Sequence, residues 1–184
     1  HLSLVHEAKK YADKVAVSIF VNPTQFAPHE DLSKYPRPLE RDLSLCEEAE
    51  AHLVFVPTVE EMYTPDHARV TVHHVSERLE GAVRPTHFEG VATVVTKLFN
   101  ILQPEIAVFG LKDLQQCAVL DAMVRSLCQP VQLVFAETVR ESDGLALSSR
   151  NQYLSESERK QAPALYACLS QIRDEFKRTS LTLS

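Results

Sequence analysis

Four short runs of apolar residues, most of them β-branched or aromatic, lie within the first 136 residues and are separated by longer stretches of mixed polarity. Continuous apolar runs, without alternating polar positions, are typical of strands buried on both faces of a parallel sheet. They predict strands at residues 15–21, 52–56, 106–109 and 131–136. A further run predicts a shorter strand at residues 69–75.

Between these runs, apolar positions recur every three or four residues, the period of a helix with one buried face. This pattern predicts helices at residues 2–12, 39–51, 91–102, 113–127 and 155–177. Ser155-Glu-Ser-Glu begins the last of them, with negative charge in the first turn, where the helix dipole favours it. Pro163 predicts a break soon after that start.

The alternation of helices and apolar strands indicates an α/β fold with a doubly wound parallel sheet. Ligands bind such sheets at the carboxyl ends of the strands, so the segments after the strands are where we look for a site. The composition becomes more polar after Tyr153, which predicts one domain at residues 1–152 and the start of a second at residues 153–184. Because the helical pattern is already under way at His1, we expect the first domain to begin before this sequence.

Composition then narrows the possible partners. Of the 184 residues, 45% are hydrophobic and 24% are charged, which is usual for a globular protein. The net charge of −6 argues against nucleic acid or an anionic membrane surface as a partner, because both require a basic protein surface. No apolar run approaches the ~20 residues that span a bilayer, and no signal-peptide pattern opens the chain.

The cysteines are far apart, form no Cys-x-x-Cys pair and fall in segments that we expect to be helical. We predict small buried thiols, as in a reducing cytoplasm; metal or redox use is the alternative. The four are Cys46, Cys117, Cys128 and Cys168. The histidines, including His73-His74, lack partners at ligand spacing, which argues against a zinc site.

Glycine is scarce, with only four in the chain. We expect each to stand where a side chain cannot be tolerated, in a turn or where backbone meets a ligand. The four are Gly81, Gly90, Gly110 and Gly144.

Gly110 ends the third apolar run, and Lys112 follows at the expected start of a helix. A lysine there opposes the helix dipole unless an anion lies between them, so a bound phosphate would reconcile the two charges. The alternative is a solvated surface lysine, with Asp113 as the N-cap of the helix.

Ser148, Ser149 and Arg150 follow the last apolar run after a short connection. Two hydroxyl groups and a planar guanidinium can together grip a phosphate. The alternative is a turn into a capped helix with a solvated arginine. Neither a P-loop nor a Gly-x-Gly-x-x-Gly motif is present in the sequence.

Uncharged amides follow the first and third apolar runs, at Asn22, Gln25, Gln115 and Gln116. Amides can orient the hydroxyl and carboxylate groups of a substrate without adding a competing acid or base. Val94 and Val95, on the helix after Gly90, could form an apolar wall beside such a substrate; the alternative is that both are core residues.

Five segments, in order over nearly the whole chain, resemble the pantoate–β-alanine ligase family. They are VSIFVNPTQF, YPRPLERDL, RPTHFEGVATVVTKLFN, FGLKDLQQ and TVRESDGLALSSRNQYLS. The resemblance implies a Rossmann-like domain of the HIGH nucleotidyltransferase superfamily followed by a small lid domain, in a cytoplasmic homodimer. It also implies truncation at both ends, with the first strand and the His-x-Gly before His1 missing.

The reaction that this resemblance implies uses ATP with Mg²⁺, pantoate and β-alanine. Pantoate displaces pyrophosphate from ATP to give pantoyl adenylate. β-Alanine then attacks the adenylate, which yields pantothenate and AMP. No covalent enzyme nucleophile is needed, so the cysteines can be structural.

The resemblance assigns residues to two sides of a site. On the nucleotide side, groups that face the phosphates, ribose and adenine would be His1, Gly110, Leu111, Lys112, Asp113, Val139, Leu147, Ser148, Ser149 and Arg150. Among these, the catalytic groups would be His1, Lys112, Ser148, Ser149 and Arg150. On the pantoate side, the lining residues would be Asn22, Gln25, Tyr35, Val94, Val95 and Gln116, and Asp42 would help to hold Mg²⁺.

The sequence departs from the family pattern at Leu111, where glutamate is usual, and at Glu137, where proline is common. Two other functions stay open. One is a different nucleotidyltransferase or carboxylate-activating enzyme of the same superfamily, which would share the phosphate grip without the pair Gln25 and Gln116. The other is an inactive binding fragment.

Overall fold

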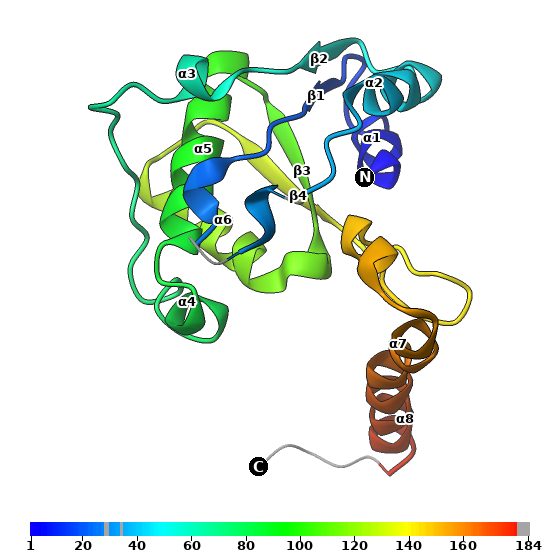
Figure 1. Ribbon diagram of the computed structural model, residues 1–184. Helices are drawn as coiled ribbons and strands as arrows, with labels where there is room; N and C mark the ends of the chain where they lie inside the picture. Colours follow the sequence, from blue (N-terminus) through cyan, green and yellow to red (C-terminus); the bar gives the residue numbers. More distant parts are fainter. Residues whose placement is uncertain (28–29, 34, 180–184) are drawn as a thin grey trace. The chain divides into compact units, whose positions relative to one another are not determined.

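The computed structural model describes residues 1–27, 30–33 and 35–179, and it divides into two compact units, His1–Glu137 (unit 1) and Thr138–Ser184 (unit 2) (Figure 1). Unit 1 carries all the described strands. Unit 2 is mainly helical.

The strands of unit 1 form two parallel ladders. β1 (Ala16–Ser18) pairs with β2 (Leu53–Phe55), in the register Val17 to Val54. β3 (Ile106–Gly110) pairs with β4 (Gln132–Ala136), in the register Val108 to Val134. The α/β class and the parallel pairing predicted from the apolar runs are therefore confirmed, although β1 and β2 are shorter than those runs.

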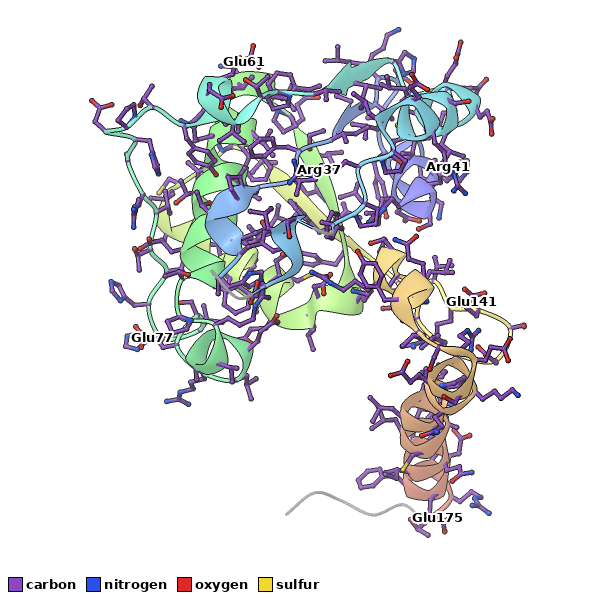
Figure 2. All side chains as sticks on the ribbon, viewed as in Figure 1. Arg37, Arg41, Glu61, Glu77, Glu141 and Glu175 are labelled. Carbon is purple, nitrogen blue, oxygen red and sulfur yellow. The ribbon has the colours of Figure 1, made fainter. Side chains whose placement is uncertain are left out.

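Helices fill the sequence between the strands, as the period predicted, with ends that differ by a few residues. The helices of unit 1 are α1 (Leu2–Ala8), α2 (Leu39–Glu48), α3 (Val59–Met62), α4 (Glu80–Val83), α5 (His87–Leu102) and α6 (Leu114–Ser126). Short 3₁₀ turns lie at η1 (Pro23–Gln25), η2 (Asp31–Ser33) and η3 (Leu111–Asp113). Thr58 and Glu61 close a capping box at the start of α3; Glu61 is labelled in Figure 2.

Two apolar clusters hold unit 1 together. In the larger one, buried residues of α5 and α6 pack with Met62 against Phe55, Phe109 and Leu133 on the strands. The smaller one joins Val5 of α1 to Val15 and Ala49, next to β1 and α2. Figure 1 shows the same division, with α5 beside β3 and β4, and α1 and α2 beside β1 and β2.

The strand predicted at residues 69–75 is wrong: this segment is irregular. Val70 and Val72 do pack against the larger cluster, which accounts for the apolar pattern. However, the Val70 N–H donates to the Thr93 hydroxyl on α5, at 2.9 Å, and not to a neighbouring strand. A side-chain acceptor on a helix therefore takes the place of a ladder partner.

Unit 2 begins with a turn closed by an antiparallel bridge between Arg140 and Ala146, and continues through η4 (Ser149–Tyr153) to α7 (Glu156–Gln161) and α8 (Ala164–Thr179). Ser155 and Glu158 form a capping box at the start of α7. Pro163 separates α7 from α8, so the predicted cap and the predicted break are both confirmed.

The four cysteines do not share one environment. Cys46 and Cys117 are buried, and burial raises the pKa of each thiol. Cys128 and Cys168 are exposed, so the prediction of four buried thiols is wrong for these two. Cys128 follows the end of α6 with a φ of 50°, outside the helix that its neighbours predicted, and Cys168 lies on an exposed part of α8.

Within the described part of the chain, no helix combines the length and the apolar character needed to cross a membrane.

Candidate active site

The segment after β1 is built around Asn22, which is only 3% exposed. Its carbonyl oxygen accepts from the Thr24 N–H at 3.3 Å, the Thr24 hydroxyl at 2.9 Å and the Tyr63 hydroxyl at 2.7 Å. Its amide nitrogen donates to the Gly90 carbonyl at 3.1 Å and to Gln25 Oε1 at 3.3 Å. The hydrogen-bonding capacity of Asn22 is therefore taken up by protein groups, and its place at the border of a substrate pocket stays a prediction.

Gly90 allows this segment to lie directly against α5. A Cβ at Gly90 would stand 2.5 Å from the Thr24 carbonyl oxygen and 2.7 Å from the Gln25 nitrogen. Real Cβ atoms do not come so close, and the atoms in the way are backbone. The expectation that glycine stands where a side chain cannot be tolerated is confirmed here.

Arg84 joins the Gln25 segment to two carboxylates. Its guanidinium forms a two-pronged pair with Glu30, both contacts at 2.6 Å, and a third contact of 2.7 Å with Glu80. Nη2, one of the two nitrogens that contact Glu30, also lies 3.4 Å from the Gln25 carbonyl, which accepts from His87 Nδ1 at 2.9 Å. The hydrogen bonds from Arg84 hold the pKa of Glu30 below its usual range, although partial burial opposes this.

Sequence reasoning assigned no role to Arg84 or His87, although both stand in the quoted segment RPTHFEG. Glu30, the partner of Arg84, lies 54 residues away from it, and the Gln25 carbonyl lies 62 residues from its partner His87, so no local period connects either pair. The signal available in the sequence was the presence of Arg84 and His87 within the six residues before Gly90.

The same group of contacts reaches the start of α6. The Glu80 N–H donates to Gln115 Oε1 at 3.0 Å, and Gln115 Nε2 donates to the carbonyls of Val75 and Arg78, at 3.0 and 2.6 Å. Gln115 is therefore a structural residue. The segments after β1 and β3 are linked through Arg84, Glu80 and Gln115, and Gln116 is the next residue along α6.

The segment after β3 is more open. Gly110 is the last residue of β3, and a Cβ there would meet no atom closer than Leu4 Cδ2, at 3.9 Å. Lys112 lies in η3 with its side chain 40% exposed, and its amine is 3.3 Å from Asp113 Oδ1. Asp113 stands at the N-cap of α6 but makes no capping hydrogen bond with its side chain. Leu111 is the first residue of η3 and is half-buried.

A hollow of about 510 Å³ lies beside the loop after β1. Its described lining residues are Phe26, Ala27, Glu30, Leu32, Ser33 and Arg37, and Arg37 is labelled in Figure 2. Tyr35 stacks edge-on against Phe26, with ring centroids 6.0 Å apart. The hollow therefore adjoins the segment that carries Gln25.

Val94 and Val95 are 6% and 7% exposed and belong to the larger apolar cluster. They lie one turn beyond Gly90 on α5. Both are therefore core residues, and contact with a substrate stays a prediction. Gln116 is half-buried, and its side chain makes no hydrogen bond within the described residues.

In unit 2, Ser148 caps η4, because its hydroxyl accepts from the Arg150 N–H at 3.3 Å. Ser149 and Arg150 are the first residues of η4. Leu147 donates its N–H to the Val139 carbonyl at 2.9 Å, and both side chains are more than 40% exposed. The capped turn weighed in the sequence is present, and phosphate binding by these residues stays a prediction.

The side chains of two predicted groups take no part in the hydrogen bonds described above. His1 is exposed at the N-cap of α1, and Asp42 lies half-buried in the first turn of α2. No cluster of three or more metal-ligating side chains occurs in the described ranges. A lone carboxylate suits a Mg²⁺ ion held mainly by nucleotide phosphates and water, which is the common arrangement for that ion.

Comparison with known proteins decides the family. The family model described as Pantoate-beta-alanine ligase matches residues 1–183. The chain belongs to the pantoate–β-alanine ligase family. A curated relative, pantothenate synthetase of Pseudomonas entomophila (strain L48), is 56% identical over 182 residues, with 97% of this chain and 63% of that protein covered.

Solved structures of the ligase family share the fold. The pantothenate synthetase of Thermus thermophilus matches with a TM-score of 0.95 at 52% identity, covering 97% of this chain and 66% of that one. The Francisella tularensis ligase, complexed with beta-gamma ATP and β-alanine, matches with a TM-score of 0.86 at 36% identity, covering 92% and 66%. The chain thus has the ligase fold and spans slightly more than three fifths of the length of its curated relatives.

Proposed function

We propose that the protein carrying this chain condenses pantoate with β-alanine, using ATP. The observation that carries the proposal is the match to the ligase family over residues 1–183, together with polar residues of the family's segments at the ends of β1 and β3. The contacts through Arg84, Glu80 and Gln115 support a common site, because they tie the Gln25 segment to the start of α6.

The first step joins pantoate to the nucleotide. A carboxylate oxygen of pantoate attacks the α-phosphorus of ATP, the bond to the β-phosphate oxygen breaks, and pyrophosphate leaves. Negative charge grows on the phosphate oxygens and the leaving group, so fixed cations and donors lower the barrier. In unit 1 we assign this task to His1 and Lys112, with Gly110, Leu111 and Asp113 beside the ribose.

Unit 2 offers further groups for the nucleotide. Ser148, Ser149 and Arg150 supply two hydroxyls and a guanidinium suited to phosphate oxygens. Val139 and Leu147 expose apolar surface suited to adenine. Mg²⁺ bound to the ATP phosphates would neutralise part of their charge, and Asp42 is the carboxylate that we assign to it.

The second step uses β-alanine. Its amine attacks the acyl carbon of pantoyl adenylate, an N–H proton is lost, and AMP leaves as the amide of pantothenate forms. This step depends mainly on holding two reactants together. We assign pantoate to Gln25 and Gln116, with Val94 and Val95 against its methyl groups and Asn22 and Tyr35 at the edge.

Isotope exchange between pyrophosphate and ATP tests the first step by itself. In the whole protein that carries this chain, we expect exchange that requires pantoate and does not require β-alanine. Exchange supported by other carboxylic acids but not by pantoate would indicate a different carboxylate-activating enzyme. Absence of exchange with any acid, in a folded protein, would favour a binding module.

The homodimer and the cytoplasmic location are part of the same proposal and rest on the family resemblance. All four cysteines are free, as is usual in a reducing compartment. Sedimentation at micromolar concentration measures the assembly, and a mass of one subunit would contradict the dimer. Cell fractionation measures the location.

A further inference from the structure

Backbone groups determine the orientation of the Asn22 side-chain amide, that is, which end is the oxygen and which is the nitrogen. The Thr24 N–H can only donate, and it faces the Asn22 carbonyl oxygen. The Gly90 carbonyl can only accept, and it faces the Asn22 amide nitrogen. Exchange of the oxygen and nitrogen of Asn22 would place like groups together at both contacts, so this orientation is the only one that satisfies them.

The orientation of the Asn22 amide determines the orientation of the Gln25 side-chain amide. Because Asn22 presents an N–H to its neighbour, the nearer end of the Gln25 amide must be the acceptor Oε1, and the distance is 3.3 Å. The Nε2 group of Gln25 is then the free end, with two hydrogens and no hydrogen-bond partner among the described residues. The main chain of Gln25 is held separately, by His87 at its carbonyl and by contact with Gly90.

Tyr63 also holds the Asn22 amide in this orientation. Its hydroxyl makes the shortest contact with the Asn22 carbonyl oxygen, 2.7 Å, and lies 3.2 Å from the Thr24 hydroxyl. The ring is held against Phe20 and His67, with centroids 6.2 and 4.8 Å away. Burial raises the pKa of Tyr63, so the phenol keeps the proton that it donates.

We propose that Tyr63 is a positioning residue for Gln25, acting through Asn22, so that Gln25 presents a hydrogen-bond donor to the substrate. The proposal deepens the proposed function and rests on it for the identity of that substrate. A donor at this point selects an oxygen acceptor, such as the carboxylate or hydroxyl oxygen of a small hydroxy acid. Tyr63 itself contacts no reacting group in this scheme.

A double-mutant cycle tests whether Tyr63 acts through Gln25. Calorimetry on the whole protein measures pantoate and ATP binding for wild type, Tyr63→Phe, Gln25→Ala and the double variant. We expect Tyr63→Phe to weaken pantoate binding about fivefold, the effect of one hydrogen bond, and to change ATP binding by less than about twofold. In the Gln25→Ala background, the same change should have no further effect. Equal effects of Tyr63→Phe in both backgrounds would overturn the proposal.

Met62→Leu supplies the matched control for a general loss of stability. Met62 is the neighbour of Tyr63 and is 1% exposed, but it makes no contact with Asn22 among the described hydrogen bonds. We expect this variant to lower the melting temperature at least as much as Tyr63→Phe while leaving pantoate binding unchanged. If Met62→Leu weakens pantoate binding as much as Tyr63→Phe does, the effect is merely structural and the proposal fails.

A second measurement needs no pantoate. The side-chain NH₂ signals of Gln25, identified in an NMR spectrum by their loss in Gln25→Glu, report directly on its amide. We expect Tyr63→Phe to shift them and Tyr11→Phe, at an exposed tyrosine, to leave them in place. Unchanged signals in Tyr63→Phe would overturn the positioning role. A wild type that binds no pantoate would contradict the proposed function, and these signals would still decide the role of Tyr63.

Discussion

After β1, the backbone of Thr24 and Gln25 lies so close to Gly90 that no Cβ fits between them, whereas after β3 the backbone at Gly110 faces open space. The first segment is held by Asn22, His87 and several other side chains, and the second presents a half-exposed lysine whose partner among the described residues is its neighbour Asp113. The difference matches the tasks that we propose for them. A small hydroxy acid needs rigid, uncharged donors, and a triphosphate needs accessible positive charge beside bare backbone.

Alanine at the two glycines gives the sharpest test of this contrast. We expect Gly90→Ala to destabilise unit 1 by about 3 kcal/mol or more, because overpacking against backbone has little room to relax. Thermal unfolding should then occur roughly 6–12 °C lower. Gly110→Ala should melt within about 2 °C of wild type, since its φ of −88° suits any residue.

Ligand binding completes the glycine comparison. If a nucleotide lies against Gly110, the added methyl group should hold it away from the backbone. We then expect ATP binding about tenfold weaker, because close contact area is lost, while the fold is unchanged. Unaltered ATP binding in Gly110→Ala would remove the nucleotide from this strand end. A normal melting temperature for Gly90→Ala would show that the first segment is not rigid.

Lys112→Ala tests the charge in the open segment. We expect pyrophosphate–ATP exchange to fall at least about 100-fold, the usual effect of removing one group that stabilises transition-state charge. The melting temperature should stay nearly constant, because an exposed ion pair contributes ~1 kcal/mol or less. Lys14→Ala, at an exposed lysine outside the site, is the control. A loss of the fold in Lys112→Ala would support the surface-structural interpretation of this residue.

Glu30→Gln tests the ion pair that supports the rigid segment. The side chains of Glu30 and Arg84 are 17% and 23% exposed, so we expect a cost of about 1–3 kcal/mol, between that of an exposed and that of a buried pair. Glu77→Gln, which breaks an exposed contact with His73, should lower the melting temperature much less than Glu30→Gln does, because solvent screens exposed pairs.

The difference in stability between wild type and Glu30→Gln should depend on pH, because it follows from the pKa of Glu30. Because the pKa is lower in the folded state than its ordinary value near 4.5, the carboxylate stabilises the fold above that value. The contribution is lost as the pH falls through the lower folded pKa. The difference in melting temperature between wild type and Glu30→Gln should therefore be constant from pH 7 to pH 5 and shrink below about 4.5. A difference that grows in acid would refute the assignment.

Thiol labelling is the test with the smallest expected effect. It measures whether the solvent access at the end of β3 reaches the buried thiol behind it. The thiol of Cys117 lies behind Gly110 and donates to its carbonyl, at 3.4 Å. We expect Cys117 and Cys46 to resist labelling in the native protein, and Cys128 and Cys168 to react. Rapid labelling of Cys117, detected by mass spectrometry of its peptide, would show that the strand end is loose as well as open.

Local patterns in the sequence were sufficient for several elements. The apolar runs located the four strands of the described residues, and the capping box at Ser155 and the break at Pro163 were both confirmed, because each depends on residues within a few positions of one another. The five quoted segments indicated the family, and the family model confirmed it. The roles of the predicted site residues, and the division between the predicted domains, stay predictions.

Only the tertiary structure decided which polar side chains form hydrogen bonds within the protein and which keep a donor or acceptor for a ligand. Asn22 and Gln25 look alike as amides after a strand, but contacts with Gly90 and Tyr63, 68 and 41 residues away from Asn22, occupy the first and orient the second. Long-range contacts likewise assigned Gln115 to structure and gave the Val70 N–H an acceptor on α5 in place of a strand partner. A hydrogen bond depends on which atoms come within about 3 Å, and only the folded chain determines that for residues so far apart.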